Sequence, residues 1–404
     1  MCALFPPSLY GSVEKVGIIM LLVYKIVTFI YQRDYWYTRQ HTLEVTDMDM
    51  FNVDNLDGAV PNMEGSDGGI GQARIKVFGC GGAGNNMVSW LYRKGLKGAE
   101  IVACNTDQQH LNITECDKKF LIGGSITKGL GCGGFPEKGA SAARENLLEI
   151  KEVLSKTDMA FVCAGMGGGT GTGAAPLIAR VAAEMGTIVI GTVTMPFNIE
   201  RARLDKAEHG LQQLRDVCDT VIVIDNNRLV KIAGNLPVQQ AFAVANELVA
   251  TMIRGIVETI SVPSLVNLDF ADVKAIMKDG GVAAIGVGYS DTNNRSSEAV
   301  GGALSNPLLD IDYRGADGAL IHIEGGPDMT LDEVERIGDE VTSNLDEDAN
   351  VIWGARVSDD MKGKICVMTI MTGVSSPWIL GKESEKDMER RKTDMGKELD
   401  INFV

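Results

Sequence analysis

The strongest chemical signal in the chain is a run of seven residues that contains five glycines, Gly167-Gly168-Gly169-Thr170-Gly171-Thr172-Gly173. It stands between an apolar stretch, 159–164, and an alanine-rich stretch, 174–185. Glycine lets the backbone approach an anion and turn its N–H groups toward it, the two threonines add hydroxyl donors, and a following helix supplies the positive end of its dipole. This pattern predicts a phosphate-binding loop between a buried strand and a helix, where a flexible linker would be out of place.

Two further glycine-rich stretches, 79–84 and 129–134, bear on which phosphate-containing ligand the chain binds. No lysine follows the glycines of 167–173, so the chain lacks the usual P-loop pattern at this position. The first stretch has the spacing Gly79-x-Gly81-x-x-Gly84, with Asp107 about 23 residues further on, as in dinucleotide-binding folds. A dinucleotide needs only one such loop. Three loops at the ends of parallel strands can surround a triphosphate, although the middle stretch has the alternative of being an ordinary turn.

The alternative function is therefore a dinucleotide-dependent oxidoreductase, favoured only by the first glycine stretch and Asp107. Its catalytic residues are not evident. The four histidines, His41, His110, His209 and His322, belong to no recognisable motif.

The elements that must position these loops alternate between strands and helices from about residue 73 onward. Strands are expected at 75–78, 100–104, 160–164, 187–193 and 221–224, and a long helix at 237–260. Strands that alternate with helices predict a parallel sheet with helices on both faces.

After Asp269 the pattern changes to that of an α+β domain. A helix is expected at 271–278 and strands at 282–289, 318–324, 350–353 and 365–372, and Thr330 with Glu333 forms a capping box for another helix. The expected domains are 73–260, with the central helix 237–260, and 261–374.

Composition limits the partners of the folded part. The formal net charge is −16, and no block of lysine and arginine stands out, which argues against nucleic acid. None of the eight cysteines forms a Cys-x-x-Cys pair, and several lie in apolar runs, which indicates core residues in a reducing compartment.

The two ends of the chain differ from its centre. Residues 1–72 are expected to be an extension, in which residues 1–47 precede a true start near Met48 or Met50 and residues 52–72 form a disordered arm. The apolar run 16–31, interrupted by Lys25, is too short for a convincing membrane span. The tail 375–404 is charged and ends in the apolar tip 401–404.

Three motifs together resemble those of the tubulin/FtsZ superfamily. The sequence of residues 131–136 resembles that of archaeal FtsZ, of the second paralogous type. The three motifs are the run 167–173, the stretch 79–86, and Asn267-Leu268-Asp269-Phe270-Ala271-Asp272-Val273, which is similar to the family's catalytic loop. The resemblance covers about residues 75–373. It implies an α/β fold in which a parallel-sheet GTP-binding domain is joined by a long central helix to a smaller α+β domain. It also implies GTP and GDP as ligands, together with Mg²⁺.

The resemblance assigns nucleotide-binding roles residue by residue. One departure concerns the ribose and phosphate contacts, because the arginine stands three positions after Glu200 instead of four and Arg201 replaces a glycine, so either arginine is a candidate. For Phe242, plain core packing is the alternative. The implied nucleotide-binding residues are Gly81, Gly82, Asn85, Asn86, Asp107, Gly131, Cys132, Gly133, Gly168, Gly169, Thr170, Gly171, Thr172, Glu200, Arg203, Asn226, Phe242 and Asn246.

The implied catalytic residues are Asn267, Asp269 and Asp272. They follow the long helix, whose length at about 1.5 Å per residue places them on the order of 20 Å or more from the base. We therefore expect Asp269 to act on the nucleotide of a neighbouring subunit, in a head-to-tail contact that generates a filament. The alternative is that Asp269 and Asp272 only cap the helix that they begin.

The family also implies partners and a location. The expected partners are further copies of the chain, in a homopolymer, and a membrane-linked adaptor that binds the tip 401–404, with no direct membrane span. The expected location is cytoplasmic, at the mid-cell division ring. A filament of the same fold that serves cell shape is the alternative.

Overall fold

The structure is a computed structural model, and it describes residues 73–261, 265–266, 268–278, 280–305, 316–343, 345–346 and 348–374. The described residues fall in one compact unit. The predictions for residues 1–72 and for the tail after residue 374 lie outside the described residues, as does the predicted catalytic residue Asn267. In the part of the chain that the structure describes, no helix is both long and apolar enough to cross a membrane.

Six parallel strands form the amino-terminal half of the sheet. Most of them are buried nearly throughout, as expected for strands that are covered by helices on both faces. The five strands predicted in this half are all present, and β3 is an additional short strand. The bounds are β1 (Ile75–Cys80), β2 (Ala99–Asn105), β3 (Lys118–Leu121), β4 (Met159–Gly165), β5 (Ile188–Met195) and β6 (Thr220–Asp225).

Helices connect these strands. The long helix, predicted at 237–260, spans 24 residues. The helices are α2 (Gly81–Arg93), α3 (Gln108–Ile113), α4 (Gly124–Thr127), α5 (Pro136–Glu145), α6 (Leu147–Leu154), α7 (Thr170–Glu184), the 3₁₀ helix η2 (Asn198–Arg203), α8 (Leu204–Arg215), α9 (Asn226–Ala233) and α10 (Val238–Ser261).

The carboxyl-terminal half is the predicted α+β arrangement. The capping box of Thr330 and Glu333 is present at the start of its last helix, where the Thr330 hydroxyl accepts from the Glu333 amide. The elements are α11 (Phe270–Met277), β7 (Gly281–Ser290), α12 (Arg295–Leu304), β8 (Gly318–Gly325), α13 (Leu331–Thr342), β9 (Asn350–Val357), the 3₁₀ helix η3 (Asp359–Met361) and β10 (Ile365–Thr372).

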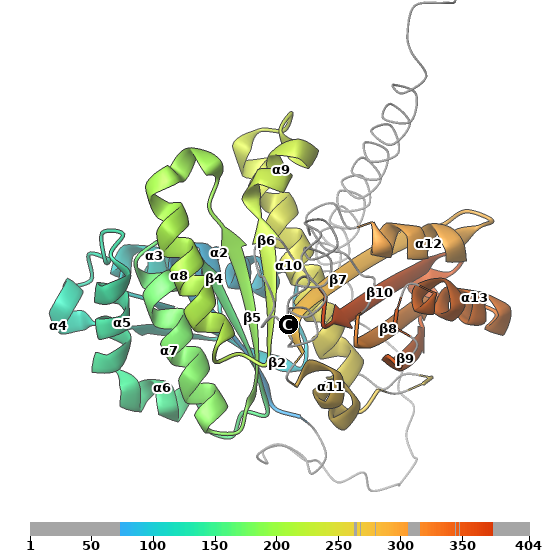
Figure 1. Cartoon of the computed structure of the whole chain (residues 1–404), viewed down its shortest axis with the longest axis horizontal. Coiled ribbons are helices and arrows are strands. Elements are labelled where there is room, and N and C mark those ends of the chain that lie inside the picture. The colour runs from blue at the N-terminus through green and yellow to red at the C-terminus, as the bar shows by residue number, and fades with distance from the viewer. Residues whose placement is uncertain are drawn as a thin grey trace, which may run out of the picture. The chain divides into compact units, whose positions relative to one another are not determined.

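The ten strands within the described residues belong to one sheet, in the order β3-β2-β1-β4-β5-β6-β7-β10-β8-β9. The two halves join where β6 and β7 pair in parallel through two residue pairs, Thr220 with Gly281 and Val221 with Val282 (Figure 1). Beyond this junction, β10 is antiparallel to both β7 and β8, and β8 is parallel to β9. The sheet thus continues from one half of the chain into the other.

Two apolar clusters cover the two faces of the sheet. One cluster contains buried residues of α5 to α8, α12 and α13, and the other contains buried residues of α2, α10 and α11. Figure 1 shows this arrangement, with α7 and α8 on one side of the first strands and α2 and α10 on the other. The predicted parallel sheet with helices on both faces is confirmed, and its strands end together at the edge that carries α9.

Helix α7 begins earlier than the alanine-rich stretch 174–185 had indicated. Its first turn already includes Thr170, Gly171 and Thr172. The glycine-rich run is therefore a short loop followed by a helical first turn, whose amides have no acceptor within the helix. Glycine is required at position 173, because a side chain there would collide with the Pro136 carbonyl oxygen of α5.

Candidate functional site

The three glycine stretches meet at the carboxyl ends of β1, β2 and β4. A Cβ atom placed on Gly81 would lie 2.8 Å from the Gly171 nitrogen, so the first turns of α2 and α7 are in contact. A Cβ atom on Gly169 would lie 2.6 Å from the Cβ atom of Cys132, which brings the middle stretch against the third. Side chains would force these loops apart, and this explains why glycine stands at both positions.

The middle stretch is held by the segment that follows β2. The Gln108 amide donates to the Gly129 carbonyl oxygen, and the Gly131 amide donates to the Thr106 carbonyl oxygen. The donor–acceptor distance is 3.0 Å in each of these hydrogen bonds. Asp107 begins α3, where its Oδ1 accepts from the His110 amide at 3.1 Å. Asp107 therefore lies beside the middle stretch, while one of its carboxylate oxygens serves as a helix cap.

Three successive backbone amides of the middle stretch point to an anion. Among the hydrogen bonds of the described residues, the amides of Cys132, Gly133 and Gly134 donate to no acceptor. Gly133 and Gly134 have φ values of 59° and 78°, a left-handed backbone that favours glycine. A run of inward-turned amides of this kind forms a concave binding site for phosphate oxygens.

A pair of buried hydroxyl groups joins the middle and third stretches. The Oγ1 atoms of Thr106 and Thr170 are 2.7 Å apart, and the Cys132 sulfur lies 3.3 Å from the Thr106 hydroxyl. The Asn105 side-chain oxygen accepts from the amides of Thr106 and Asp107, which fixes the turn after β2. Sequence reasoning missed Asn105 and Thr106, although their place at the end of a predicted strand, directly before Asp107, was a usable signal.

Two neighbouring asparagines at the start of α2 differ in environment. The Asn86 side chain is exposed, whereas Asn85 is buried and neither of its side-chain polar atoms has a hydrogen-bond partner. A buried amide without partners is unusual in a folded protein. Asn85 therefore lies inside the helix-sheet contact rather than at the open surface of the site.

The residues predicted to surround a base lie along α9 and α10. Asn226 begins α9 directly after β6, and Phe242 and Asn246 follow on α10. Phe242 is 43% exposed, so it is not a core residue, and its ring stands edge-on to Phe197 with centroids 6.0 Å apart. The structure thus leaves the Phe242 ring available for a flat ligand.

The segment with Glu200 and Arg203 packs on the third glycine stretch. Arg203 donates to the Glu200 carboxylate at 2.5 Å, and Glu200 also accepts from the Phe197 amide. A Cβ atom on Gly167 would lie 2.9 Å from the Arg203 Cβ atom. Both Arg201 and Arg203 are exposed on the 3₁₀ helix η2, and the backbone-proximal part of Arg203 lies against the glycine stretch.

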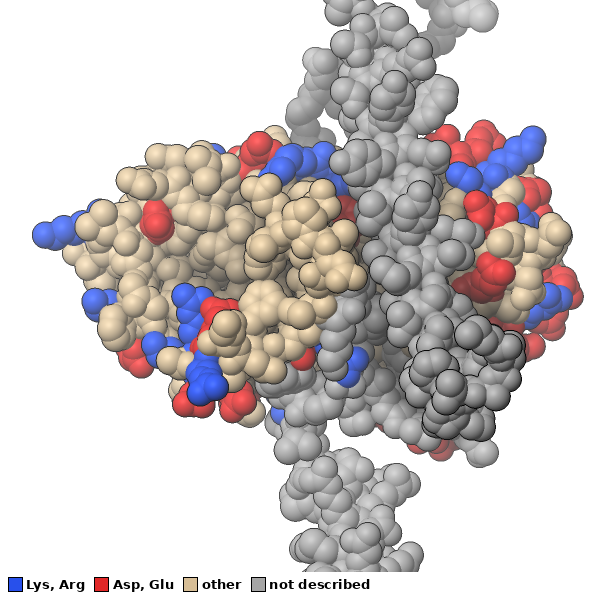
Figure 2. Space-filling model, turned by 90° about the horizontal axis from the view of Figure 1, so that it is seen from above, with Lys and Arg blue, Asp and Glu red and all other residues tan. Residues whose placement is uncertain are grey.

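The surface around this site carries few charges. Figure 2 looks onto the edge where the parallel strands end, and the surface on its left is mostly uncharged, with positive and negative side chains gathered along its upper and lower margins. A phosphate group bound here would rely on backbone amides and a few local cations, as the acidic composition suggested.

Cysteines below the loops behave as core residues. The sulfurs of Cys80 and Cys104 are 3.6 Å apart in the buried β1–β2 pair. The contact with Cys104 and burial raise the pKa of the Cys80 thiol well above its usual range, and burial raises the pKa of Cys163 to about 12. These thiols stay protonated, in agreement with the prediction of small core residues.

Asp269 and Asp272 form a capping box at the start of α11. The Asp269 side chain accepts from the Asp272 amide at 2.8 Å, and the Asp272 side chain accepts from the Asp269 amide at 3.2 Å. The helix-capping role raised as an alternative is therefore real. Asp269 is nevertheless exposed, so its carboxylate faces outward while it caps.

The acidic capping box lies beyond the far end of α10 from Phe242. Helix α10 has 24 residues, so its ends are about 36 Å apart at 1.5 Å per residue. The chain then runs through Val266, which pairs with Ala355 of β9, before α11 begins. Phe242, near the start of α10, and the acidic capping box, beyond its end, are therefore separated by most of the length of one rigid helix.

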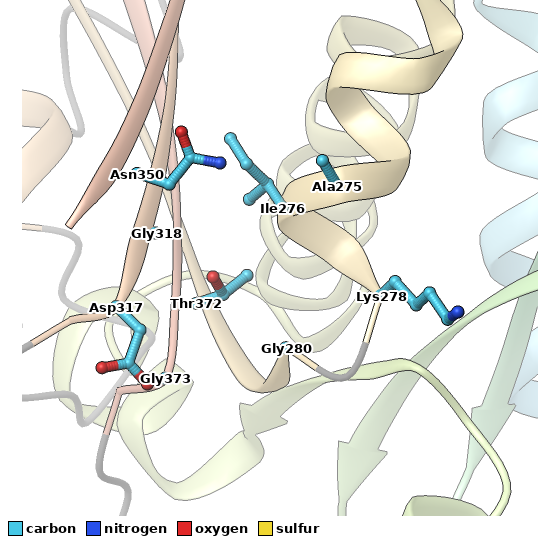
Figure 3. Close-up of a pocket in the computed structure, with 9 residues that line it drawn as sticks. All are labelled: Ala275, Ile276, Lys278, Gly280, Asp317, Gly318, Asn350, Thr372 and Gly373. Atoms are coloured by element: carbon cyan, nitrogen blue, oxygen red, sulfur yellow. The ribbon is translucent and has the colours of Figure 1, made fainter.

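A separate pocket of about 160 Å³ opens in the carboxyl-terminal half. Its lining comes from the end of α11 and from the ends of β8, β9 and β10, and none of the predicted site residues contributes to it. Figure 3 shows Asn350 and Ile276 facing each other while Lys278 points away. This pocket is distinct from the glycine-lined site.

Comparison with known proteins identifies the class. The family model described as "Tubulin/FtsZ family, GTPase domain" matches residues 74–234, and the one described as "FtsZ family, C-terminal domain" matches residues 281–375. The chain therefore belongs to the tubulin/FtsZ family, as its three motifs predicted, and it is a GTPase that binds GTP and GDP. The matches do not favour the dinucleotide-dependent oxidoreductase.

Within the family, the chain is similar to archaeal proteins named FtsZ 2. It is 57% identical over 321 residues to "Cell division protein FtsZ 2" of Methanocaldococcus jannaschii, an alignment that covers 78% of this chain and 84% of the relative. The protein of the same name from Halobacterium salinarum is 52% identical over 81% of this chain and 83% of its own length.

Solved structures agree with this assignment. The structure titled "FtsZ dimer, empty" from M. jannaschii is 46% identical, with a TM-score of 0.70 over 74% of this chain and 88% of that chain. The GDP-bound monomer of CetZ1 from Haloferax volcanii has a TM-score of 0.66 at 24% identity, over 79% of this chain and 99% of that chain. The likeness to CetZ1 concerns the fold alone.

Proposed function

We propose that the chain is a cell-division GTPase that assembles head to tail into filaments and hydrolyses GTP at the contact between subunits. The names of its relatives support the cellular role, and one relative's structure is titled as a dimer. The observation that carries the proposal is the separation of the Phe242 side of the site from the acidic capping box by most of the length of α10. The corresponding location is the division site.

The proposed phosphate contacts are backbone amides. Those of Gly81 and Gly82 open α2, those of Gly131 to Gly133 belong to the middle stretch, and those of residues 168–172 lead into α7. Helix amino termini and concave runs of amides both favour anions. Thr170 and Thr172 add hydroxyls, of which the Thr172 hydroxyl is buried and has no partner.

The proposed base contacts are side chains. The Phe242 ring packs on guanine, and Asn226, Asn246 and Asn86 hydrogen-bond its edge. Phe242 and Asn246 are four residues apart, so one face of α10 presents both. Asp107, Glu200 and Arg203 border the ribose and phosphates, with Arg203 rather than Arg201 as the arginine that packs against the third glycine stretch.

The proposed catalytic group comes from the next subunit. Asp269 and Asp272 are too far along the chain to reach their own nucleotide, because α10 separates them from the base site. A subunit whose α11 docks on the pocket of its neighbour makes a heterologous contact, which does not close and generates a filament. The two carboxylates, with Asn267, then orient the attacking water, because phosphoryl transfer depends on positioning and electrostatics.

Mg²⁺ is proposed to accompany the nucleotide. The described part of the chain has no group of three or more His, Cys, Asp or Glu residues that could hold a metal ion. The Mg²⁺ ion would be held mainly by phosphate oxygens and water, and the hydroxyls of Thr170 and Thr172 would be its protein neighbours. When bound, the ion would neutralise charge on the phosphates.

Two observations test the proposal directly. Electron microscopy should show filaments with GTP and none with GDP or without nucleotide. Hydrolysis per subunit should also rise with protein concentration, because the active site needs two subunits. Filament-free samples with full GTP turnover, or turnover strictly proportional to protein down to nanomolar concentrations, would refute hydrolysis at the subunit contact.

We propose separately that a membrane-linked adaptor binds the tip 401–404. Deletion of the tip should then abolish placement at the division site, and unchanged placement would contradict the proposal.

A further inference from the structure

One lysine contacts the middle glycine stretch and a second lies beside it at Phe135, and the proposed function gives neither a role. The Lys206 ammonium of α8 donates to the Gly134 carbonyl oxygen at 2.8 Å. The same ammonium lies 5.5 Å from the centre of the Phe135 ring, and the Lys138 ammonium of α5 lies 5.1 Å from it. Phe135 is 52% exposed, so this cluster lies at the rim of the site.

Neither lysine is neutralised by a carboxylate. Among the ion pairs of the described residues, none includes Lys138 or Lys206. The chain as a whole has a net charge of −16, so two uncompensated cations beside a run of open amides are notable. Positive charge at this position favours a bound anion.

Helix α8 contacts both the middle and the third glycine stretch. Next to its first turn, Arg203 packs on Gly167 of the third stretch, and further along a Cβ atom on Gly210 would collide with the Thr172 methyl group. Lys206 reaches from the same helix to Gly134 of the middle stretch. Because α8 is rigid, the Lys206 hydrogen bond sets the position of the middle stretch relative to the third.

The order of the strands indicates which phosphate the middle stretch faces. The base contacts follow β6 and lie on α10, whereas the middle stretch pairs with Asp107, which follows β2. In the sheet, β1, β4 and β5 stand between β2 and β6. A nucleotide whose base lies at the β6 end therefore extends its phosphates toward β2, and the terminal phosphate lies nearest the middle stretch.

We propose that Lys206 is a positioning residue that makes the pocket distinguish GTP from GDP. Its hydrogen bond fixes the Gly134 carbonyl and thereby orients the amides of Cys132, Gly133 and Gly134 toward the terminal phosphate. Lys138 lies against the same Phe135 ring and adds a second positive charge beside these amides. This inference rests on the proposed placement of the guanine nucleotide in the glycine-lined site.

The test uses the full chain at protein concentrations too low for assembly. Affinities for fluorescent mant-GTP and mant-GDP are measured for the wild type, Lys206→Met, Lys206→Arg and Lys151→Met. Methionine keeps the apolar stem of lysine without the donor, and Lys151 is an exposed lysine of α6 that serves as the matched control. Lys206→Met should weaken mant-GTP binding by about tenfold and mant-GDP binding by less than about twofold, since hydrogen bonds from charged groups are among the stronger ones.

The other variants complete the test. Lys206→Arg should retain most of the preference for mant-GTP because arginine also donates to a carbonyl, and Lys151→Met should match the wild type. Equal losses for the two nucleotides, no loss, or an arginine variant as poor as the methionine variant would each overturn the role of Lys206. If the wild type bound neither nucleotide, the proposed function would fail instead. Thermal unfolding without nucleotide checks that each variant is folded.

Discussion

At the scale of single residues, the site consists of small groups whose positions depend on one another. The hydroxyls of Thr106 and Thr170 are 2.7 Å apart in a buried environment, where the cost of an unpaired polar group is highest. The sequence identified the glycines and Thr170 because glycine-rich runs are distinctive. It did not identify Thr106, because a lone threonine at the end of a strand carries no signal until the fold brings it to a partner.

Replacing Thr106 with valine tests this pair. Thr106→Val should lower the free energy of unfolding by about 1 kcal/mol and weaken GTP binding by roughly fivefold, because the Thr170 hydroxyl loses its short hydrogen bond and keeps only the Cys132 sulfur at 3.6 Å. The matched control is Thr187→Val, which removes a buried 2.8 Å hydrogen bond to the Thr157 carbonyl oxygen at the opposite edge of the sheet. The control should lose similar stability, measured by urea unfolding, with unchanged GTP affinity. Equal affinity losses in both variants would contradict a specific role for Thr106.

At the scale of elements, the strand pattern was largely readable and the short helices were not. The five strands predicted in the first half are present because buried parallel strands leave continuous apolar runs. Helices α5 and α6, between residues 136 and 154, were not predicted, because their pattern is interrupted at Asn146, the one residue that separates them. The start of α7 was placed too late, because glycines resemble a loop even when they form the first turn of a helix.

The acidic element α11 combines a structural and a proposed chemical role, and Asp269→Asn separates them. Asparagine caps helices as well as aspartate does, so stability should stay at the wild-type level while GTP hydrolysis falls roughly a hundredfold. Thr330→Ala is the control, because it removes the cap of α13, which has the same capping box. It should cost about 1 kcal/mol of stability with unchanged hydrolysis. Wild-type turnover in Asp269→Asn, measured by phosphate release, would exclude a catalytic role.

At the scale of the whole molecule, the two halves share one sheet through the pairing of β6 with β7. Sequence reasoning placed a domain boundary near residue 260 and had no means of finding this junction, because it depends on contacts between residues about 60 positions apart. The separation of Asn246 on α10 from Asp269 was, by contrast, predictable, since helix length follows directly from residue number. That separation is the reason for proposing a site shared by two subunits.

Mixing two defective variants tests the shared site most directly. Asp269→Asn should bind GTP without hydrolysing it, and the double variant Phe242→Ala with Asn246→Ala should keep the acidic capping box but fail to bind GTP. If Asp269 acts on the nucleotide of a neighbour, the mixture should release phosphate at a rate well above the sum of the two separate rates, with a maximum near equal amounts. A mixture that never exceeds that sum, while Asp269→Asn still binds GTP, would contradict hydrolysis at the contact between subunits.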